Sequence, residues 1–79
     1  MDNTDILQTL AAIVEEVTGF ESAEVTSEKS FTDDLDIDSL SMVEITVVIE
    51  DRFEVRIPDD QVAELRTVGD AVNYIADHR

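Results

Sequence analysis

Asp36-Ile37-Asp38-Ser39-Leu40-Ser41-Met42-Val43-Glu44 is the stretch in which an aspartate-rich segment turns into a helix. A serine at the start of a helix is most often only the N-cap. Here Asp38 can take the cap position, which leaves Ser39 as the first helical residue with its hydroxyl directed outward. A phosphoryl group attached to Ser39 would lie near the free N–H groups and the positive end of the helix. We therefore expect the chain to present Ser39 to other proteins.

The helix that follows, expected at residues 39–53, has two apolar faces. At about 100° per residue, one face carries Met42, Ile45, Ile49 and Phe53. The nearly opposite face carries Leu40, Val43 and Val47, interleaved with Glu44, Glu50 and Asp51. We expect the first face to lie in the core. The second, an apolar strip rimmed by carboxylates, is typical of a surface that docks partners. The alternative is a helix buried on both faces.

The flanking segments predict further helices around this one. Apolar residues at three- and four-residue spacing predict a helix at 4–18 that ends before Gly19. A long connection at 20–38 follows, with a turn of helix expected at 27–30. Its apolar residues should pin it to the core; they are Phe20, Val25, Phe31, Leu35 and Ile37. Pro58 predicts a short helix that reaches residue 64. Thr67 and Asp70 form a capping-box pair for a last helix at 67–77.

The expected fold is therefore all-α: a four-helix bundle with three longer helices, one short helix and a long first loop. The 79 residues favour one domain, residues 1–79. The buried face of the last helix should hold Val68, Ala71, Val72, Tyr74 and Ile75. Apolar residues make up 43% of the chain and follow periodic patterns, which argues against disorder.

The net charge of −15 is the strongest global property of the chain. Nucleic acids and anionic membranes would repel such a surface, whereas basic patches on other proteins would attract it. No apolar run approaches the roughly 18 residues of a membrane span. The acidic first residues argue against a signal peptide, and the absence of cysteine suits the cytoplasm. No large spare apolar surface is evident, so we expect a monomer.

The residues of ordinary enzymes are missing. The one histidine, His78, lies next to the C-terminus, and the chain has no glycine-rich phosphate loop. We therefore expect no catalytic residues and no enzyme activity. Asp34, Asp36 and Asp38 read as D-x-D-x-D, but an EF-hand needs glycine at its sixth position and glutamate at its twelfth. Ser39 and Ile45 stand there instead, so no metal site is expected. Weak, adventitious binding of Ca²⁺ or Mg²⁺ by the crowded carboxylates remains a hypothesis.

The sequence around Ser39 resembles the D-S-L motif of acyl carrier proteins, with Asp38-Ser39-Leu40 followed by Glu44. The likeness runs through nearly the whole chain. Further matching segments are Phe31-Thr32-Asp33-Asp34-Leu35, Glu50-Asp51-Arg52-Phe53, Ile57-Pro58-Asp59 and Thr67-Val68-Gly69-Asp70-Ala71-Val72. The motif is most similar to that of type II fatty-acid-synthase carriers of actinobacteria, including the meromycolate carriers. Ser41 and Arg52 depart from a usually more acidic pattern.

The resemblance implies a function and a cofactor. A phosphopantetheinyl transferase would use coenzyme A and Mg²⁺ to attach 4′-phosphopantetheine to Ser39, and the thiol of this arm would carry the growing acyl chain as a thioester. The acyl chain would fold between the second and third helices. Candidates for lining that pocket are Met42, Ile45, Ile49, Val62, Leu65 and Ala71.

The resemblance also implies partners. Basic patches on ketoacyl synthases, reductases, a dehydratase and a malonyl transferase would meet a docking surface on the second helix. Its expected residues are Asp38, Leu40, Val43, Glu44, Val47 and Asp51. A polyketide-synthase or D-alanyl carrier is the nearest alternative. A non-carrier acidic adaptor that docks a basic protein is the alternative from another class.

Overall fold

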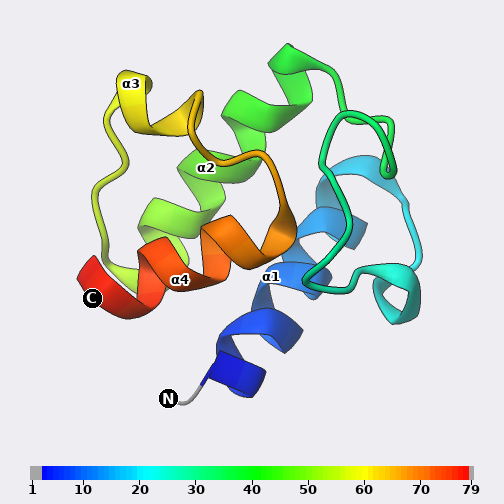
Figure 1. The fold of residues 1–79 in the computed structure, drawn as a ribbon, viewed down its shortest axis with the longest axis horizontal. Coiled ribbons are helices and arrows are strands. Elements are labelled where there is room, and N and C mark those ends of the chain that lie inside the picture. Colours follow the sequence, from blue (N-terminus) through cyan, green and yellow to red (C-terminus); the bar gives the residue numbers. More distant parts are fainter. Residues whose placement is uncertain (1–2, 79) are drawn as a thin grey trace.

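Residues 3–78, which the computed structural model describes, form an all-helical bundle (Figure 1). Its elements are α1 (Asn3–Thr18), the 3₁₀ helix η1 (Ser22–Glu24), α2 (Ser39–Phe53), α3 (Asp59–Val62) and α4 (Val68–His78). The expected bundle of three longer helices, one short helix and a long first loop is confirmed. In Figure 1 the loop between α1 and α2 occupies one side of the molecule, and α2 begins where that loop ends.

The helix boundaries follow the predicted ones closely, with small differences at the ends. Helix α2 spans the predicted residues, and α1 begins one residue earlier, at Asn3. Helix α3 ends at Val62 rather than at residue 64, because the next turn tightens. There the N–H groups of Glu64 and Leu65 donate to carbonyls only three residues back, at 3.0 and 3.2 Å.

Helix α4 begins with the predicted capping box. Thr67 Oγ1 accepts the N–H of Asp70 at 3.1 Å, and Asp70 Oδ2 accepts the N–H of Thr67 at 3.2 Å. Thr67 is therefore the cap, and the helix itself starts at Val68 and ends at His78, one residue later than predicted. Tyr74 is half-buried rather than buried, because its hydroxyl reaches out to donate to the carbonyl of Arg56 at 2.8 Å.

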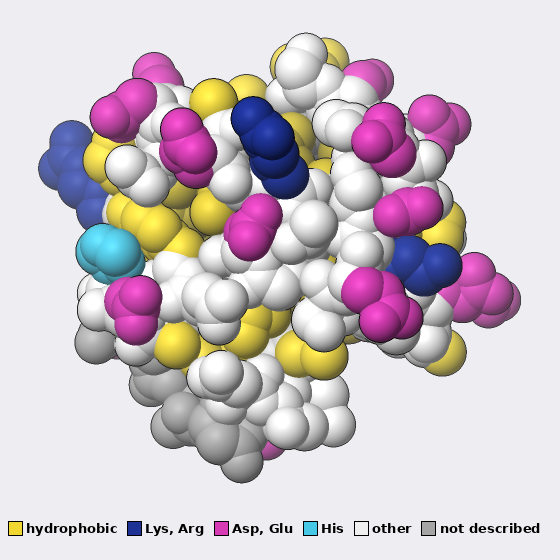
Figure 2. Space-filling view, in the orientation of Figure 1, with side chains coloured by type: hydrophobic (Ala, Val, Ile, Leu, Met, Phe, Trp, Pro, Cys, Tyr) yellow, Lys and Arg dark blue, Asp and Glu magenta, His cyan; other side chains and the backbone are white. Residues whose placement is uncertain are grey.

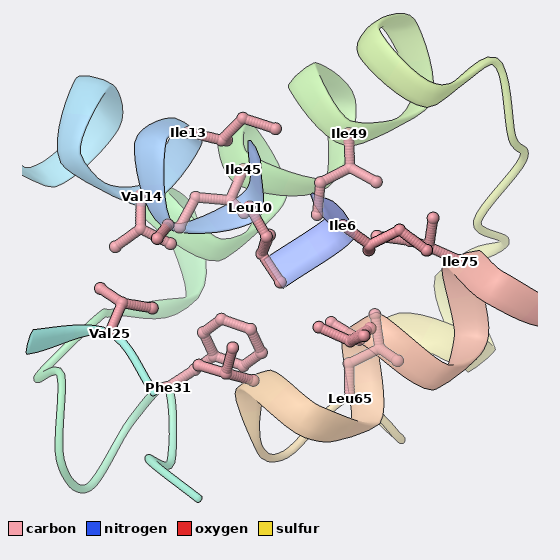
Figure 3. Close-up of a cluster of buried hydrophobic side chains, with 14 of the residues drawn as sticks. Ile6, Leu10, Ile13, Val14, Val25, Phe31, Ile45, Ile49, Leu65 and Ile75 are labelled. Atoms are coloured by element: carbon pink, nitrogen blue, oxygen red, sulfur yellow. The ribbon is translucent and has the colours of Figure 1, made fainter. Parts of the chain in front are cut away.

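Helix α1 contacts both α2 and α4, and the core lies between these three helices. Side chains from the loops complete it, as Figure 3 shows for Phe31 and Leu65, which point into the same cluster as Leu10 and Ile6 of α1. Four of the five apolar residues expected to pin the long loop are buried, namely Val25, Phe31, Leu35 and Ile37. The fifth, Phe20, is only half-buried.

The two apolar faces of α2 have different surroundings. Met42, Ile45, Ile49 and Phe53 are buried, as predicted. Leu40, Val43 and Val47 on the other face are 78%, 53% and 56% exposed. A helix buried on both faces is therefore excluded, and α2 leaves an apolar strip open to solvent.

The predicted turn of helix at 27–30 is wrong, because those residues pair with the start of α4. Ser30 and Thr67 form an isolated antiparallel bridge. The N–H of Phe31 donates to the carbonyl of Arg66 at 3.0 Å, and the N–H of Val68 donates to Lys29 at 2.9 Å. The short helical turn forms earlier instead, as η1. The long loop is thus fastened to the connection between α3 and α4.

Acidic side chains are spread widely over the face shown in Figure 2, with few basic side chains among them. Within residues 3–78, no helix combines the length and the apolar character that a membrane span requires.

Gly69 makes the close approach between the loop and α4 possible, so Gly69→Ala should destabilise the fold. Its N–H donates to the Ser27 carbonyl at 2.8 Å, and an added Cβ would lie 2.9 Å from the same oxygen. Alanine normally stabilises a helix by about 1 kcal/mol relative to glycine. Here we expect the free energy of unfolding, measured with urea, to fall by roughly 1–3 kcal/mol, because the added Cβ forces the backbone to move.

Gly19→Ala is the matched control. Gly19 has a φ of +79° but nothing within 4 Å of an added Cβ, so only backbone strain opposes the substitution. Both variants should lose stability, but only Gly69→Ala should also shift the amide resonances of residues 29–31. A Gly69→Ala protein more stable than wild type would show that the contact with Ser27 is not tight.

Candidate functional site

Ser39 is the first residue of α2, and its side chain is exposed. The residue before it, Asp38, is the N-cap, as predicted: its Oδ1 accepts the N–H of Ser41 at 2.8 Å, and its carbonyl accepts the N–H of Met42 at 2.9 Å. The cap is therefore made without Ser39. Within the described residues, the Ser39 hydroxyl has no hydrogen-bond partner, and the residue is exposed.

The carboxyl group of Asp38 is held in its ionised form by the helix that it caps. The backbone N–H of Ser41, and secondarily the Ser41 hydroxyl, lower the pKa of Asp38 below its ordinary value, because both donate to the carboxylate. A carboxylate with a lowered pKa is a weak base. Asp38 therefore orients the start of α2 and is poorly suited to take a proton from Ser39.

The other aspartates of the run have separate roles. Asp34 Oδ2 accepts the N–H of Ser30 at 2.8 Å and so closes the preceding turn. Asp36 adopts a left-handed conformation with φ of 54°, which turns the chain into α2. No three acidic, histidine or cysteine side chains between residues 3 and 78 gather in a way that could hold a metal ion. The hypothesis of adventitious cation binding thus finds no ligand cluster in this part of the chain.

A pocket of about 470 Å³ opens beside Ser39. Its walls come from residues 30–33 of the long loop, from the first half of α2, and from the end of α3 with the connection that follows it. Three of the predicted pocket residues, Met42, Val62 and Leu65, line it. The other three, Ile45, Ile49 and Ala71, do not, because their side chains are packed inside the core.

Sequence reasoning missed part of this lining. Phe31 and Arg66 belong to it, and both are brought there by the pairing of the loop with the start of α4. Phe31 was expected only to pin the loop to the core. No local sequence pattern predicts that residues 30 and 67 pair. The sequence therefore does not predict that Phe31 and Arg66 share one pocket with Ser39.

All six predicted docking residues are exposed: Asp38, Leu40, Val43, Glu44, Val47 and Asp51. Leu40, Val43 and Val47 recur along one face of α2 that begins next to Ser39. Glu50, which lies near this face in sequence, has a structural role instead. Its Oε2 accepts the N–H of Ile57 at 2.8 Å and ties the following loop to α2.

Comparisons with known proteins agree with this geometry. Residues 8–75 match a family model described as the phosphopantetheine attachment site. The chain is 59% identical over 76 residues to the acyl carrier protein of Acidothermus cellulolyticus, covering 96% of this chain and 90% of that protein. It is 66% identical over 71 residues to the meromycolate extension acyl carrier protein of Mycolicibacterium smegmatis, covering 90% of this chain and 72% of that protein.

Among solved structures, the fold is similar to that of the acyl carrier protein from Enterococcus faecalis. The TM-score is 0.82 at 34% sequence identity, and the match covers 100% of both chains.

The cap at Asp38 predicts a pH-dependent stability. Asp38→Ala removes the acceptor for the Ser41 N–H, and the melting temperature at pH 7 should fall by on the order of 5 °C. Because the folded-state pKa is lowered, the charge-dependent part of the cap's contribution is fully present above the ordinary value of 3.8 and is lost as the pH falls through the lowered pKa. Thermal melts should therefore show the difference between the two proteins narrowing, but not vanishing, below about pH 4.

Asp38→Asn keeps a side-chain oxygen at the cap without a titrating charge. We expect it to retain most of the stability at pH 7 and to lose the pH-dependent part. If Asp38→Asn were as unstable as Asp38→Ala, capping by the side-chain oxygen would be the wrong explanation.

Proposed function

This chain belongs to the acyl carrier protein family, and from that premise we propose that it serves a type II fatty acid synthase with Ser39 as the attachment residue. It is a carrier in fatty acid synthesis and not an enzyme, and its cofactor is 4′-phosphopantetheine. When bound, this arm supplies the thiol on which acyl groups are held as thioesters. The observation that supports Ser39 is its exposed hydroxyl, which has no partner among residues 3–78, at the start of a helix whose cap is made by Asp38.

The proposed attachment reaction is a phosphoryl transfer from coenzyme A to Ser39. The Ser39 oxygen forms a bond to the phosphorus that bears pantetheine, and the bond from that phosphorus to adenosine 3′,5′-bisphosphate breaks. The hydroxyl proton passes to a base. The lowered pKa of Asp38 makes that residue a poor acceptor of this proton, and in this proposal the base is a group of the phosphopantetheinyl transferase.

The pocket beside Ser39 suits the acyl chain in this proposal. Ser39 itself belongs to its lining, and Met42, Val62 and Leu65 supply apolar walls together with Phe31. Burial of methylene groups there would be favourable by about 0.8 kcal/mol each. That Ile45, Ile49 and Ala71 line the acyl pocket stays a prediction for a longer acyl chain. Such a chain could reach them only by separating packed side chains.

The exposed face of α2 is the proposed docking surface. As an acyl carrier protein, the chain acts together with a transferase and fatty acid synthase enzymes. We propose that basic patches on the phosphopantetheinyl transferase, ketoacyl synthases, reductases, dehydratase and malonyl transferase contact this face. Leu40, Val43 and Val47 would give apolar contact, while Glu44, Asp51 and Asp38 would steer the approach. A monomeric state, a single domain and a cytoplasmic location belong to the same proposal.

Attachment at Ser39 is tested by intact mass spectrometry. After incubation with coenzyme A, Mg²⁺ and a broad-specificity transferase, wild-type protein should gain one phosphopantetheinyl group. Ser39→Ala should gain none, whereas Ser41→Ala, the matched control two residues further along α2, should gain one as wild type does. Absence of any gain in wild type would favour the non-carrier adaptor instead.

The docking surface is tested by charge reversal. Glu44→Lys should lower the kcat/KM of a cognate ketoacyl synthase at low salt by roughly tenfold, the size of a contact worth about 1.4 kcal/mol. The exposed change should alter the free energy of unfolding by under about 0.5 kcal/mol. Asp77→Lys makes the same change of charge on α4 and should leave the kinetics close to wild type. Equal effects of the two substitutions would mean that net charge, not this face, governs docking.

A further inference from the structure

The pocket beside Ser39 has one basic side chain in its lining, Arg66. Basic side chains are few in a chain with a net charge of −15, so one in this pocket lining stands out. Arg66 is exposed and forms no ion pair with any residue between 3 and 78. Asp33, in the same pocket lining, carries a negative charge. It would repel the phosphodiester attached to Ser39, so that group needs a positive charge nearby.

The backbone of Arg66 is tied to the segment that leads into Ser39. The Arg66 carbonyl accepts the N–H of Phe31 at 3.0 Å, and the Phe31 carbonyl accepts the N–H of Ile37 at 2.9 Å. Phe31 is 1% exposed, so the residue in the middle of this relay is fixed by the core. Ile37 lies two residues before Ser39. Two backbone hydrogen bonds therefore link the segment that carries Arg66 to the residues just before Ser39.

The other basic side chains among the described residues are placed differently. Arg52 pairs with Glu16 of α1 at 3.3 Å. Arg56 follows the C-terminal end of α2, the end opposite to Ser39, and lines a separate hollow. Lys29 is not part of the pocket wall. Arg66 alone in this part of the chain shares a cavity with the attachment residue.

We propose that Arg66 is the counter-charge that this chain supplies to the phosphodiester on Ser39, and that the pairing holds the arm across the mouth of the pocket. This inference rests on the proposed attachment at Ser39. A guanidinium group suits the role because its planar set of donors matches two phosphate oxygens at once. The positive end of α2, which begins at Ser39, would also favour the negative charge of the phosphodiester.

The pairing of Arg66 with the phosphodiester would shift the equilibrium between an acyl chain sheltered in the pocket and one exposed to solvent. With the phosphodiester drawn toward Arg66, the arm starts its path over the apolar wall rather than into solvent. Exposed ion pairs are modest in strength, so the bias should be about two- to fivefold. That size suits a carrier that must release its chain to each partner enzyme. Arg66 is thus a positioning residue and takes no part in the chemistry.

The test compares the loaded proteins with Arg66→Gln, Arg66→Lys and Arg56→Gln. The Arg56 variant is the matched control, because it removes the same charge from an exposed arginine at the other end of α2. Each protein is loaded with phosphopantetheine, its mass and thermal melt are checked, and the ³¹P resonance of the phosphodiester is followed from low to high salt. Each is then charged with octanoate, and cleavage of the thioester by hydroxylamine is timed.

In wild type and in Arg56→Gln, the ³¹P resonance should move as salt breaks the pair. In Arg66→Gln it should begin near the high-salt position and stay there, and Arg66→Lys should recover part of the movement. Cleavage of the octanoyl thioester should be about two- to fivefold faster in Arg66→Gln than in the control.

Identical behaviour of Arg66→Gln and Arg56→Gln would overturn the inference. A wild-type ³¹P resonance that does not move with salt would overturn it as well. Both results leave attachment at Ser39 intact. Failure of wild type to gain the phosphopantetheinyl mass would instead contradict the proposed function, so the two failures are distinguishable.

Discussion

The pairing of residues 27–31 with residues 66–69 is the constraint on which the rest of the structure depends. The N–H groups of Phe31, Val68 and Gly69 donate across it to Arg66, Lys29 and Ser27. Without it, a loop of about 20 residues would lose too much conformational entropy to stay ordered. With it, Phe31 enters the core, and its carbonyl accepts the N–H of Ile37 at 2.9 Å just before Ser39. The position of Ser39 is therefore set by contacts with the far end of the chain.

The acidic character of the chain serves two purposes that compete. Fifteen net negative charges repel one another and weaken a small bundle, yet they attract basic partners. The structure reduces the conflict by giving several carboxylates backbone N–H partners, as at Asp34, Asp38 and Glu50. Others, such as Glu44 and Asp51, stay exposed on α2. The recognition that we propose thus depends on charges that contribute little to folding.

The local elements could be predicted because their causes lie within a few residues. The extent of α2, its cap at Asp38 and the capping box of Thr67 and Asp70 each depend on neighbours along the chain. The division of α2 into a buried and an exposed apolar face followed from helical spacing, although spacing alone left open whether both faces were buried. The helical turn at 27–30 was mispredicted because the carbonyls of Ser27 and Lys29 accept N–H groups of Gly69 and Val68, far along the chain. Local propensity carries no information on such a partner.

By itself, the sequence determined the class of fold, the placement of Ser39 at the start of a helix and the apolar strip beside it. These follow from periodicity and capping, which act over one or two helical turns. Only the tertiary structure decided which side chains surround Ser39. It placed Met42, Val62 and Leu65 around the pocket, kept Ile45, Ile49 and Ala71 in the core, and added Phe31 and Arg66. The physical reason is that a pocket is formed by segments distant in sequence, and their meeting depends on how the whole core packs.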